Sequence, residues 1–249
     1  MRLTSLVFFL ALLARAAAAA PDLHFASGAK RVALIELYTS EGCSSCPPAE
    51  RWLGALREDP GLWRDYVPVA FHVNYWDDLG WKDRLASRAF TARQYSLANA
   101  WGARSVYTPC FVRDGAEWHP DSGSPAPDAG APGVLSVDVA ENLCRVRWAA
   151  GSPAAASESE VHVALLGGGL LSRITAGENR GSTLAHDFVV LGLADHGLES
   201  PAGATGEAEF PLPAPAVPGA RRLAIAAWVT HRGDLVPLQA TGGWLDSGD

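Results

Sequence analysis

The residues with the clearest chemistry in this 249-residue chain are Cys43 and Cys46, two cysteines three positions apart. They follow the apolar run 32–37, which has the length of a strand, and a short polar turn closed by Gly42, and a helix-competent segment, 49–56, comes after them. Residues i and i+3 in a first helical turn have Cα atoms within the roughly 4.4–6.8 Å that a disulfide spans. The spacing therefore predicts a dithiol at the junction between a strand and a helix.

The start of a helix favours redox chemistry. Unpaired backbone N–H groups there stabilise an anion and lower a thiol pKa from its free value of about 8.5. We expect Cys43, nearer the loop, to be the exposed nucleophile and Cys46 to be the resolving thiol. Pro47 and Pro48 lack amide hydrogens, so they limit how late the helix can begin. A permanent structural disulfide and half of a zinc site are the alternatives, although no second C-x-x-C or H-x-x-x-H follows.

The N-terminal segment 1–20 is typical of a cleavable secretory signal. It contains Arg2, an apolar core at 3–13 and a run of small residues that ends in alanines. The core is too short to span a bilayer, so we expect no membrane anchor after cleavage and a periplasmic or extracellular location. Removing Arg2 and Arg15 changes the formal net charge from −7 to −9, which argues against nucleic acid or an anionic membrane as partner.

A second apolar run, 67–73, is separated from the first by a helix-length segment, which predicts a βαβ unit with parallel strands. The aromatic and acidic loop 74–83 that follows lies at the same sheet edge as the dithiol, where ligand sites of open α/β sheets gather. Trp76 and Trp81 either form the floor of a substrate groove or simply bury the loop. His72 is either a hydrogen-bonded core residue or a ligand.

The next segments predict a helix and two strands. Apolar residues follow a helical stripe over 81–103, which ends near Gly102. The segment 106–118 has the pattern of two short strands joined by an Asp-Gly turn. Because Pro109 opens the first of these strands, the bond before it is a candidate cis peptide.

These elements together resemble the thioredoxin superfamily, in their βαβαββ order, the C-x-x-C at the first helix and the Thr-Pro before the third strand. In that fold the Thr-Pro bond is cis and packs against the dithiol, so the resemblance places Thr108 and Pro109 beside the cysteines, in the substrate-binding surface. Thioredoxins also carry a buried acid in the preceding strand that relays the resolving thiol's proton. Glu36 is similar to that acid with one extra position in the turn; the alternative is that Glu36 faces solvent at the strand end.

The chain is more closely similar to a family of exported bacterial proteins catalogued as domain-of-unknown-function family 1223. The resemblance covers 32–119 strongly and the remainder loosely, and it implies a fold more than a function. The similar runs are E-L-Y-T-S at 36–40, G-C-S-S-C-P-P-A at 42–49, F-H-V at 71–73, Y-W-D at 75–77, L-G-W-K-D at 79–83 and V-Y-T-P at 106–109.

Cys110 departs from the family pattern, in which a glutamine usually follows the Thr-Pro. Its thiol could pair with Cys144 as a structural bridge, be an inert buried group, or act as a soft ligand for Cu(I). The corresponding Cu(I) site would consist of Cys43, Cys46, Cys110 and His72.

The remainder of the chain predicts an all-β unit. The segment 120–133 has linker composition where the thioredoxin fold would place its last helix. Seven short apolar or alternating runs between 134 and 249 predict an antiparallel sandwich. The segment 177–181, with His186, is expected to form a long hairpin loop that could reach over the dithiol. The predicted architecture is therefore a thioredoxin-like domain at 32–119 without its last helix, a linker, and a β-sandwich domain at 134–249.

The predicted function is an exported thiol-disulfide oxidoreductase that acts on protein or small thiol substrates and has a separate redox partner. Its catalytic residues would be Cys43 and Cys46, and it would need no cofactor beyond the redox-active disulfide. The alternatives are a periplasmic Cu(I)-binding carrier and a non-catalytic binding protein with a structural disulfide.

Overall fold

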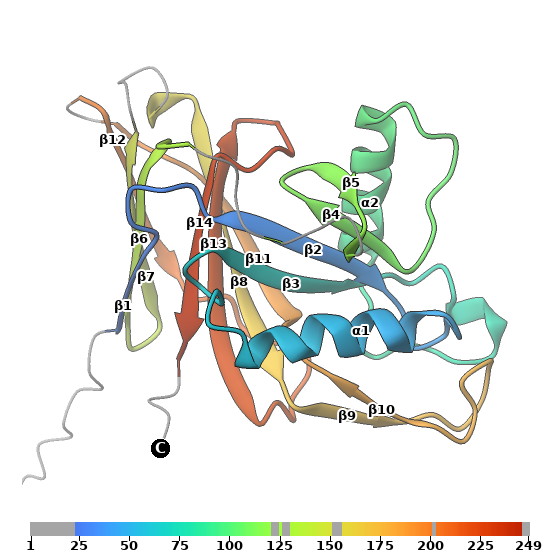
Figure 1. Cartoon of the computed structure of the whole chain (residues 1–249). Coiled ribbons are helices and arrows are strands. Elements are labelled where there is room, and N and C mark those ends of the chain that lie inside the picture. The colour runs from blue at the N-terminus through green and yellow to red at the C-terminus, as the bar shows by residue number, and fades with distance from the viewer. Residues whose placement is uncertain (1–22, 121–124, 126–129, 151–155, 201–202, 246–249) are drawn as a thin grey trace, which may run out of the picture.

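A computed structural model describes residues 23–120, 125, 130–150, 156–200 and 203–245, and these form a mixed α/β structure (Figure 1). The predicted signal segment 1–20 lies outside the described residues. No helix in the described part of the chain is long and apolar enough to cross a membrane.

The largest element is an eight-stranded sheet with the strand order β14-β13-β8-β11-β3-β2-β4-β5. Its central strands β2 and β3 pair in parallel, and all seven residues of each are buried. This burial explains why both strands are nearly continuous apolar runs, since layers on both faces cover them. The strands are β2 (Ala33–Thr39), β3 (Tyr66–His72), β4 (Cys110–Arg113), β5 (Ala116–Trp118), β8 (Ser159–Gly168), β11 (Val189–Gly197), β13 (Arg222–His231) and β14 (Gln239–Trp244).

Helices α1 (Cys46–Ala55) and α2 (Arg88–Ala100) cover opposite faces of β2. Thr39 contacts α1 through Glu50, whereas Glu36 contacts α2 through Arg93. Thr39 and Glu36 are three positions apart in one strand, so their side chains point to opposite faces. Short 3-10 turns, η1 (Leu56–Glu58) and η2 (Asp77–Leu79), follow α1 and precede α2.

Helix α2 is shorter than the predicted 81–103. The segment before it stays in a loop because Asp83 accepts hydrogen bonds from the backbone N–H groups of Glu41 and Leu85. Ser87 then caps the helix, since its hydroxyl accepts from the N–H of Ala89. The predicted hairpin of β4 and β5 is confirmed, with positive φ at Asp114 and Gly115 in its turn.

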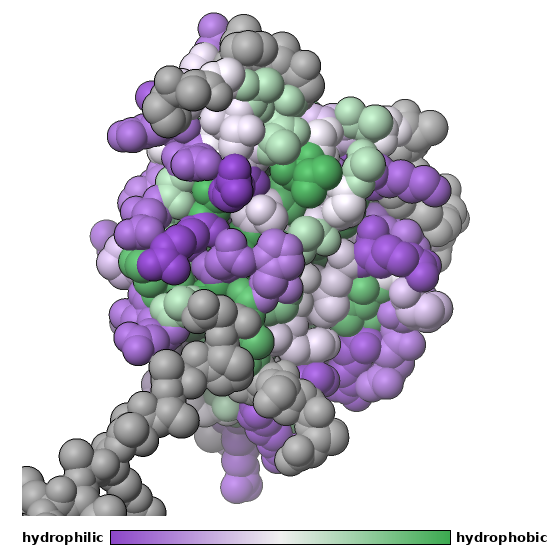
Figure 2. All heavy atoms as spheres, turned by 90° about the vertical axis from the view of Figure 1, so that its left-hand side faces the viewer, coloured by the Kyte–Doolittle hydropathy of each residue, from purple (hydrophilic) through white to green (hydrophobic). Residues whose placement is uncertain are grey.

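The second half of the chain contributes strands to three sheets. A four-stranded antiparallel sheet has the order β1-β6-β7-β12 and packs on one end of the large sheet. Strand β7 alternates buried and exposed residues. Figure 2 shows the side of the molecule on which this four-stranded sheet lies, where many hydrophilic residues are interspersed with hydrophobic ones. The strands are β1 (Leu23–Ala26), β6 (Gly133–Ala140), β7 (Leu143–Ala150) and β12 (Thr205–Pro211).

The large sheet is continuous across the two domains that the sequence predicts. Strands β8, β11, β13 and β14 all come from the second half, and β11 lies beside β3. The N–H of Ala70 in β3 donates to the carbonyl of Phe188 at 2.8 Å, so the second half satisfies an edge that would otherwise be unpaired. The segment 134–249 therefore shares a sheet with the first half and is not a sandwich closed on itself.

A hairpin of β9 (Leu170–Arg173) and β10 (Thr183–His186) extends from this second half and runs beside α1 (Figure 1). Its loop reaches toward the junction between β2 and α1. The hairpin therefore carries residues of the second half to the edge of the sheet where the cysteines lie.

Candidate active site at the Cys43–Cys46 disulfide

Cys43 and Cys46 form a disulfide at the start of α1, with their Cα atoms 5.5 Å apart. Helix α1 begins at Cys46, whose N–H donates to the carbonyl of Cys43 at 3.3 Å, and two prolines follow in the first turn. Gly42 is required in the preceding turn because a Cβ there would lie 2.9 Å from the Cβ of Trp76. The predicted position of the cysteine pair, between a strand and a helix, is confirmed.

Both cysteines are buried, with exposed fractions of 1% for Cys43 and 0% for Cys46. The expectation that Cys43 is exposed is therefore wrong. The loop between β9 and β10 covers this turn. The Nδ2 of Asn179 donates to the carbonyls of Glu41 at 2.9 Å and of Cys43 at 3.0 Å, and Glu178 accepts from the N–H of Ser44 at 3.0 Å. The predicted hairpin loop at 177–181 is thus confirmed, and it contacts the dithiol turn.

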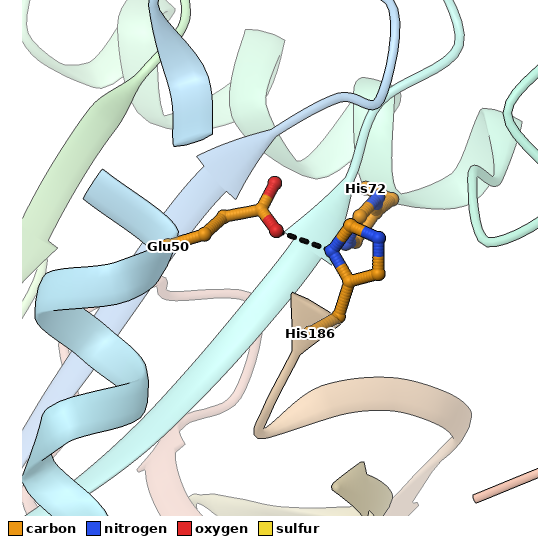
Figure 3. A group of neighbouring side chains, drawn as sticks. All are labelled: Glu50, His72 and His186. Atoms are coloured by element: carbon orange, nitrogen blue, oxygen red, sulfur yellow. Dashed lines mark hydrogen bonds and ion pairs between the residues drawn. The ribbon is translucent and has the colours of Figure 1, made fainter. Parts of the chain in front are cut away.

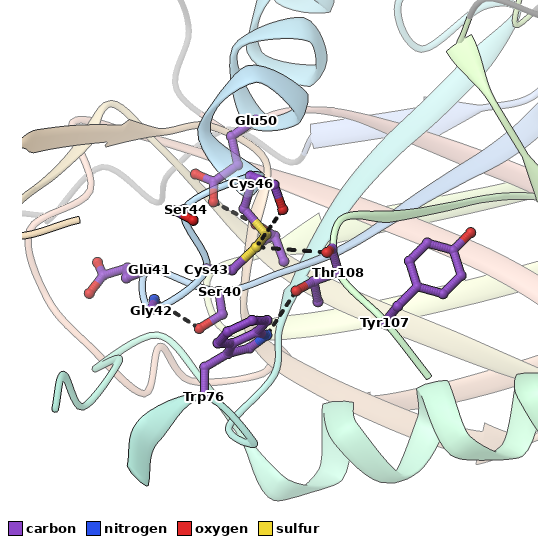
Figure 4. The surroundings of a disulfide bond; sticks show 12 residues. Ser40, Glu41, Gly42, Cys43, Ser44, Cys46, Glu50, Trp76, Tyr107 and Thr108 are labelled. Atoms are coloured by element: carbon purple, nitrogen blue, oxygen red, sulfur yellow. Dashed lines mark hydrogen bonds between the residues drawn. A yellow bond between two sulfur atoms is a disulfide. The ribbon is translucent and has the colours of Figure 1, made fainter. Parts of the chain in front are cut away.

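Thr108 lies beside the disulfide, as the resemblance implies (Figure 4), and Pro109 directly follows it. The bond between them is cis, and the carbonyl oxygen of Thr108 lies 3.8 Å from the Sγ of Cys43. The indole of Trp76 donates to the Oγ1 of Thr108 at 2.8 Å, which holds this turn against the cysteines. Cys43 is therefore the sulfur that faces the Thr-Pro turn.

Trp81 contacts the dithiol turn through Glu41. Its Nε1 donates to the Oε2 of Glu41 at 2.7 Å, and its side chain is half-buried. Trp76 and Trp81, the two candidates for a groove floor or for burial of their loop, both lie at the dithiol turn. Each is fixed there by a hydrogen bond from its indole nitrogen.

Glu36 is fully buried, so it does not face solvent, but the structure does not bring it to the disulfide. Its carboxylate pairs with Arg93 of α2 at 2.8 and 3.0 Å and accepts from the hydroxyl of Tyr38 at 2.7 Å. Strand residues alternate between faces, so the one extra position in the turn directs this acid to the α2 face. The acids that lie in the surroundings of the disulfide are Glu41 and Glu50 (Figure 4).

Glu50 belongs to a buried cluster of ionisable residues that sequence reasoning missed. The cluster contains three carboxylates, Glu41, Glu50 and Asp83, and two histidines, His72 and His186. The Nδ1 of His186 contacts Glu50, and its Nε2 lies 3.3 Å from the Oε1 of Glu41. The Nδ1 of His72 lies 2.7 Å from the Oδ2 of Asp83. The only sequence signals were a histidine within an apolar strand and two acids flanking the C-x-x-C.

The charges of the cluster stabilise one another. Burial lowers the pKa of His186, but Glu41 and Glu50 outweigh it and raise that pKa to about 10. Burial likewise lowers the pKa of His72, but Asp83 outweighs it, so the pKa is raised. Burial raises the pKa of Glu50, but hydrogen bonding to His186 outweighs it and lowers that pKa. Without a bound ion, these shifts favour the charged forms of the two histidines and of Glu50.

Cys110 lies apart from the disulfide. It pairs in register with Tyr38, so its side chain points to the α2 face, where burial raises the pKa of its thiol to about 11. The possible bridge to Cys144 does not form, since both thiols are free and Cys144 lies in the core between the two sheets. The structure thus does not gather Cys43, Cys46, Cys110 and His72 into one set of Cu(I) ligands. The residues that it does place at metal-binding distances are Glu50, His72 and His186, whose ligand atoms lie within 4.8 Å of one another.

Comparisons with known proteins bear on the fold and the family of this chain. A search of curated proteins found no match. Among solved structures, protein AGR_C_4864 from Agrobacterium tumefaciens is 22% identical with a TM-score of 0.62, over 88% of this chain and 97% of that one. HBP35 of Porphyromonas gingivalis is 14% identical with a TM-score of 0.63, over 90% of this chain and 78% of that one. At these identities the likeness concerns the fold alone.

The family model described as a protein of unknown function (DUF1223) matches residues 34–230, and the chain therefore belongs to the DUF1223 family.

Proposed function

We propose that this protein is an exported, thioredoxin-like thiol-disulfide oxidoreductase that uses Cys43 and Cys46. The observation that carries the proposal is the disulfide at the first turn of α1, with the carbonyl of Thr108, next to a cis Pro109, 3.8 Å from the Sγ of Cys43. The order β2-α1-β3-α2-β4-β5 supports the thioredoxin-like assignment of the first half.

In the reduced protein, the Cys43 thiolate attacks one sulfur of a substrate disulfide. That bond breaks, the first substrate sulfur leaves as a thiolate that takes a proton, and a mixed disulfide forms. Cys46, as a thiolate, then attacks the Sγ of Cys43 and releases the second substrate sulfur. The substrate is reduced to two thiols and the protein is oxidised to its disulfide. A separate thiol or disulfide partner restores the starting state, and the substrate is a disulfide-containing protein or small molecule.

Cys43 is the attacking sulfur in this proposal for two reasons. It precedes the first turn of α1, where the helix dipole stabilises an anion. It also faces the Thr-Pro turn, against which a substrate chain would align. Glu36 has no part in the mechanism, since Arg93 and Tyr38 hold its carboxylate on the opposite face of β2.

Access to the sulfurs requires the β9–β10 loop to move, because Asn179 and Glu178 hold it against the dithiol turn. Loops fixed by a few hydrogen bonds open locally at far lower cost than the core unfolds. The substrate would therefore reach Cys43 through local opening of this hairpin.

Burial of both sulfurs favours a second candidate, a non-catalytic binding protein in which the disulfide is structural. The reduction potential separates the two. Catalytic pairs lie between about −120 and −270 mV, whereas structural disulfides lie below about −300 mV. Equilibration of the mature protein in dithiol redox buffers, followed by alkylation of the free thiols, measures this value. A potential well below about −300 mV would replace the oxidoreductase proposal with the second candidate.

Turnover of a protein disulfide with a dithiol as reductant tests the mechanism directly. Cys43→Ser is expected to abolish turnover, and Cys46→Ser to accumulate the mixed disulfide on Cys43. Cys144→Ser is the matched control, because it removes a buried free thiol from the core between the two large sheets, away from the disulfide. Turnover that persists in Cys43→Ser contradicts the proposal.

A further inference from the structure

Three side chains from separate elements converge beside the disulfide. Glu50 comes from the middle of α1, His72 from the last position of β3 and His186 from the last position of β10. Their exposed fractions are 8%, 0% and 1%, and Figure 3 shows the two imidazoles and the carboxyl directed toward one another. One ligand atom from each lies within 4.8 Å of the others.

Each histidine has one nitrogen beside a carboxylate outside this group of three. The Nδ1 of His72 lies 2.7 Å from the Oδ2 of Asp83, and the Nε2 of His186 lies 3.3 Å from the Oε1 of Glu41. Metal-binding histidines almost always have such a partner, which fixes the ring and leaves the other nitrogen for the metal. Here the remaining atoms are the Nε2 of His72, which is buried without a hydrogen-bond partner, and the Nδ1 of His186, which contacts Glu50. The contact between His186 and Glu41 is an ion pair without hydrogen-bond geometry.

The outer carboxylates are themselves held in place. The Oε2 of Glu41 accepts from Trp81 at 2.7 Å, and Asp83 accepts from the N–H groups of Glu41 and Leu85 at 2.9 and 2.8 Å. Within the group of three, the Oε1 of Glu50 accepts from the hydroxyl of Thr39 at 2.6 Å. A second layer of hydrogen bonds therefore orients the side chains of the site, as in known metal-binding sites.

Charge also favours a cation at this position. Glu41, Glu50 and Asp83 bring three buried carboxylates around two imidazoles. Buried charge is costly unless an opposite charge lies beside it. A divalent cation between the imidazoles and Glu50 would supply that charge. Two protonated imidazoles are the competing way to supply it.

We propose that Glu50, His72 and His186 bind one divalent transition-metal ion, with zinc as the representative. Two imidazole nitrogens and one carboxylate oxygen suit zinc, cobalt, manganese or iron, whereas thiolate ligands would be needed to select Cu(I). Three protein ligands leave at least one coordination position open. The site uses neither cysteine, so it is independent of the thiol chemistry proposed above.

The proposal is tested by isothermal titration calorimetry, in which Zn²⁺ is added to the chelator-treated mature protein. The disulfide is kept oxidised so that neither Cys43 nor Cys46 can bind the ion, and the two remaining thiols, Cys110 and Cys144, are buried away from the site. We expect one ion per chain with a Kd below about 1 μM, and titration with Co²⁺ should give the visible absorption of a site with nitrogen and oxygen ligands. Absence of stoichiometric binding of both ions overturns the proposal and leaves protonated histidines as the occupants of the cluster.

Variants assign the ligands. His186→Gln, His72→Gln and Glu50→Gln should each weaken Zn²⁺ binding at least 100-fold, and retained binding in all three would overturn the assignment. His162→Gln is the matched control. His162 is also buried beside a carboxylate, but both of its nitrogens have partners, Asp195 at 2.6 Å and Thr230 at 3.0 Å. A Cys43→Ser/Cys46→Ser double variant should keep the zinc affinity while losing all disulfide turnover, so failure of one proposal is distinguishable from failure of the other.

Discussion

Replacing Asn179 with alanine tests whether the β9–β10 loop limits access to the disulfide. The Asn179 amide donates two hydrogen bonds, at 2.9 and 3.0 Å, to the carbonyls of Glu41 and Cys43, and the residue is 9% exposed. A neutral hydrogen bond contributes about 0.5–1.5 kcal/mol net, so the pair stabilises the closed loop by about 1–3 kcal/mol. At about 1.4 kcal/mol for each factor of ten, the open population should rise by about 5- to 150-fold in Asn179→Ala.

The assay is the rate at which a small dithiol reduces the Cys43–Cys46 disulfide, followed by the appearance of alkylatable thiols. If the sulfurs react only in the open state, this rate rises in proportion to the open population. Asn142→Ala is the control, since Asn142 is an exposed residue in the turn between β6 and β7, on the other sheet. The midpoint of thermal unfolding is measured in parallel, because global unfolding would also expose the sulfurs.

A reduction rate within about twofold of the wild type would refute the reasoning. It would mean that the disulfide reacts without release of these two hydrogen bonds. A large increase in rate with an unchanged unfolding midpoint would instead identify the hairpin as the barrier to substrate entry.

Three further predictions concern stability. Gly42→Ala places a Cβ 2.9 Å from the Cβ of Trp76, so it should destabilise the fold by about 1–3 kcal/mol, measured by urea unfolding; an unchanged midpoint would show that the turn is loosely packed. Glu36→Gln leaves the buried Arg93 charge without its carboxylate and should cost about 3–5 kcal/mol, while the reduction potential of the disulfide stays constant. In metal-free protein the pKa of His186 rises from about 6.5 unfolded to about 10 folded, so its contribution to stability is full below pH 6.5 and is lost as the pH rises toward 10. Unfolding free energies measured from pH 6 to 10 should therefore fall in the wild type and fall less in His186→Gln, and parallel curves would exclude this origin.

Features that depend on neighbouring residues were predictable from the sequence. The C-x-x-C spacing brings the two Cα atoms close enough for a disulfide. In the structure the disulfide is present and these Cα atoms are 5.5 Å apart. The two apolar runs separated by a helix-length segment indicated a parallel strand pair, and β2 and β3 form such a pair. A proline at the start of β4 indicated the cis bond before Pro109.

Glu36 shows where sequence reasoning stops being sufficient. Ile35 and Leu37 on either side made burial one of two alternatives for Glu36, and the structure shows it buried, but the direction of its side chain was not predictable. A single residue more or less in the turn moves every strand side chain to the other face. The strand's alternation therefore decides which helix the acid meets, and in the folded chain it meets Arg93 of α2.

The sequence by itself determined the dithiol, its strand and helix, and the Thr-Pro turn, because each of these follows from contacts between residues close in the chain. The tertiary structure alone decided that the second half adds strands to the same sheet, since strand order is set by distant edges that need partners. It also decided that the β9–β10 loop is hydrogen-bonded to the dithiol turn and that Glu41, Glu50, His72, Asp83 and His186 form one buried cluster. These acids and histidines lie up to 145 positions apart in the printed sequence, and only the packing of α1, β3 and β10 brings their charges close enough to stabilise one another.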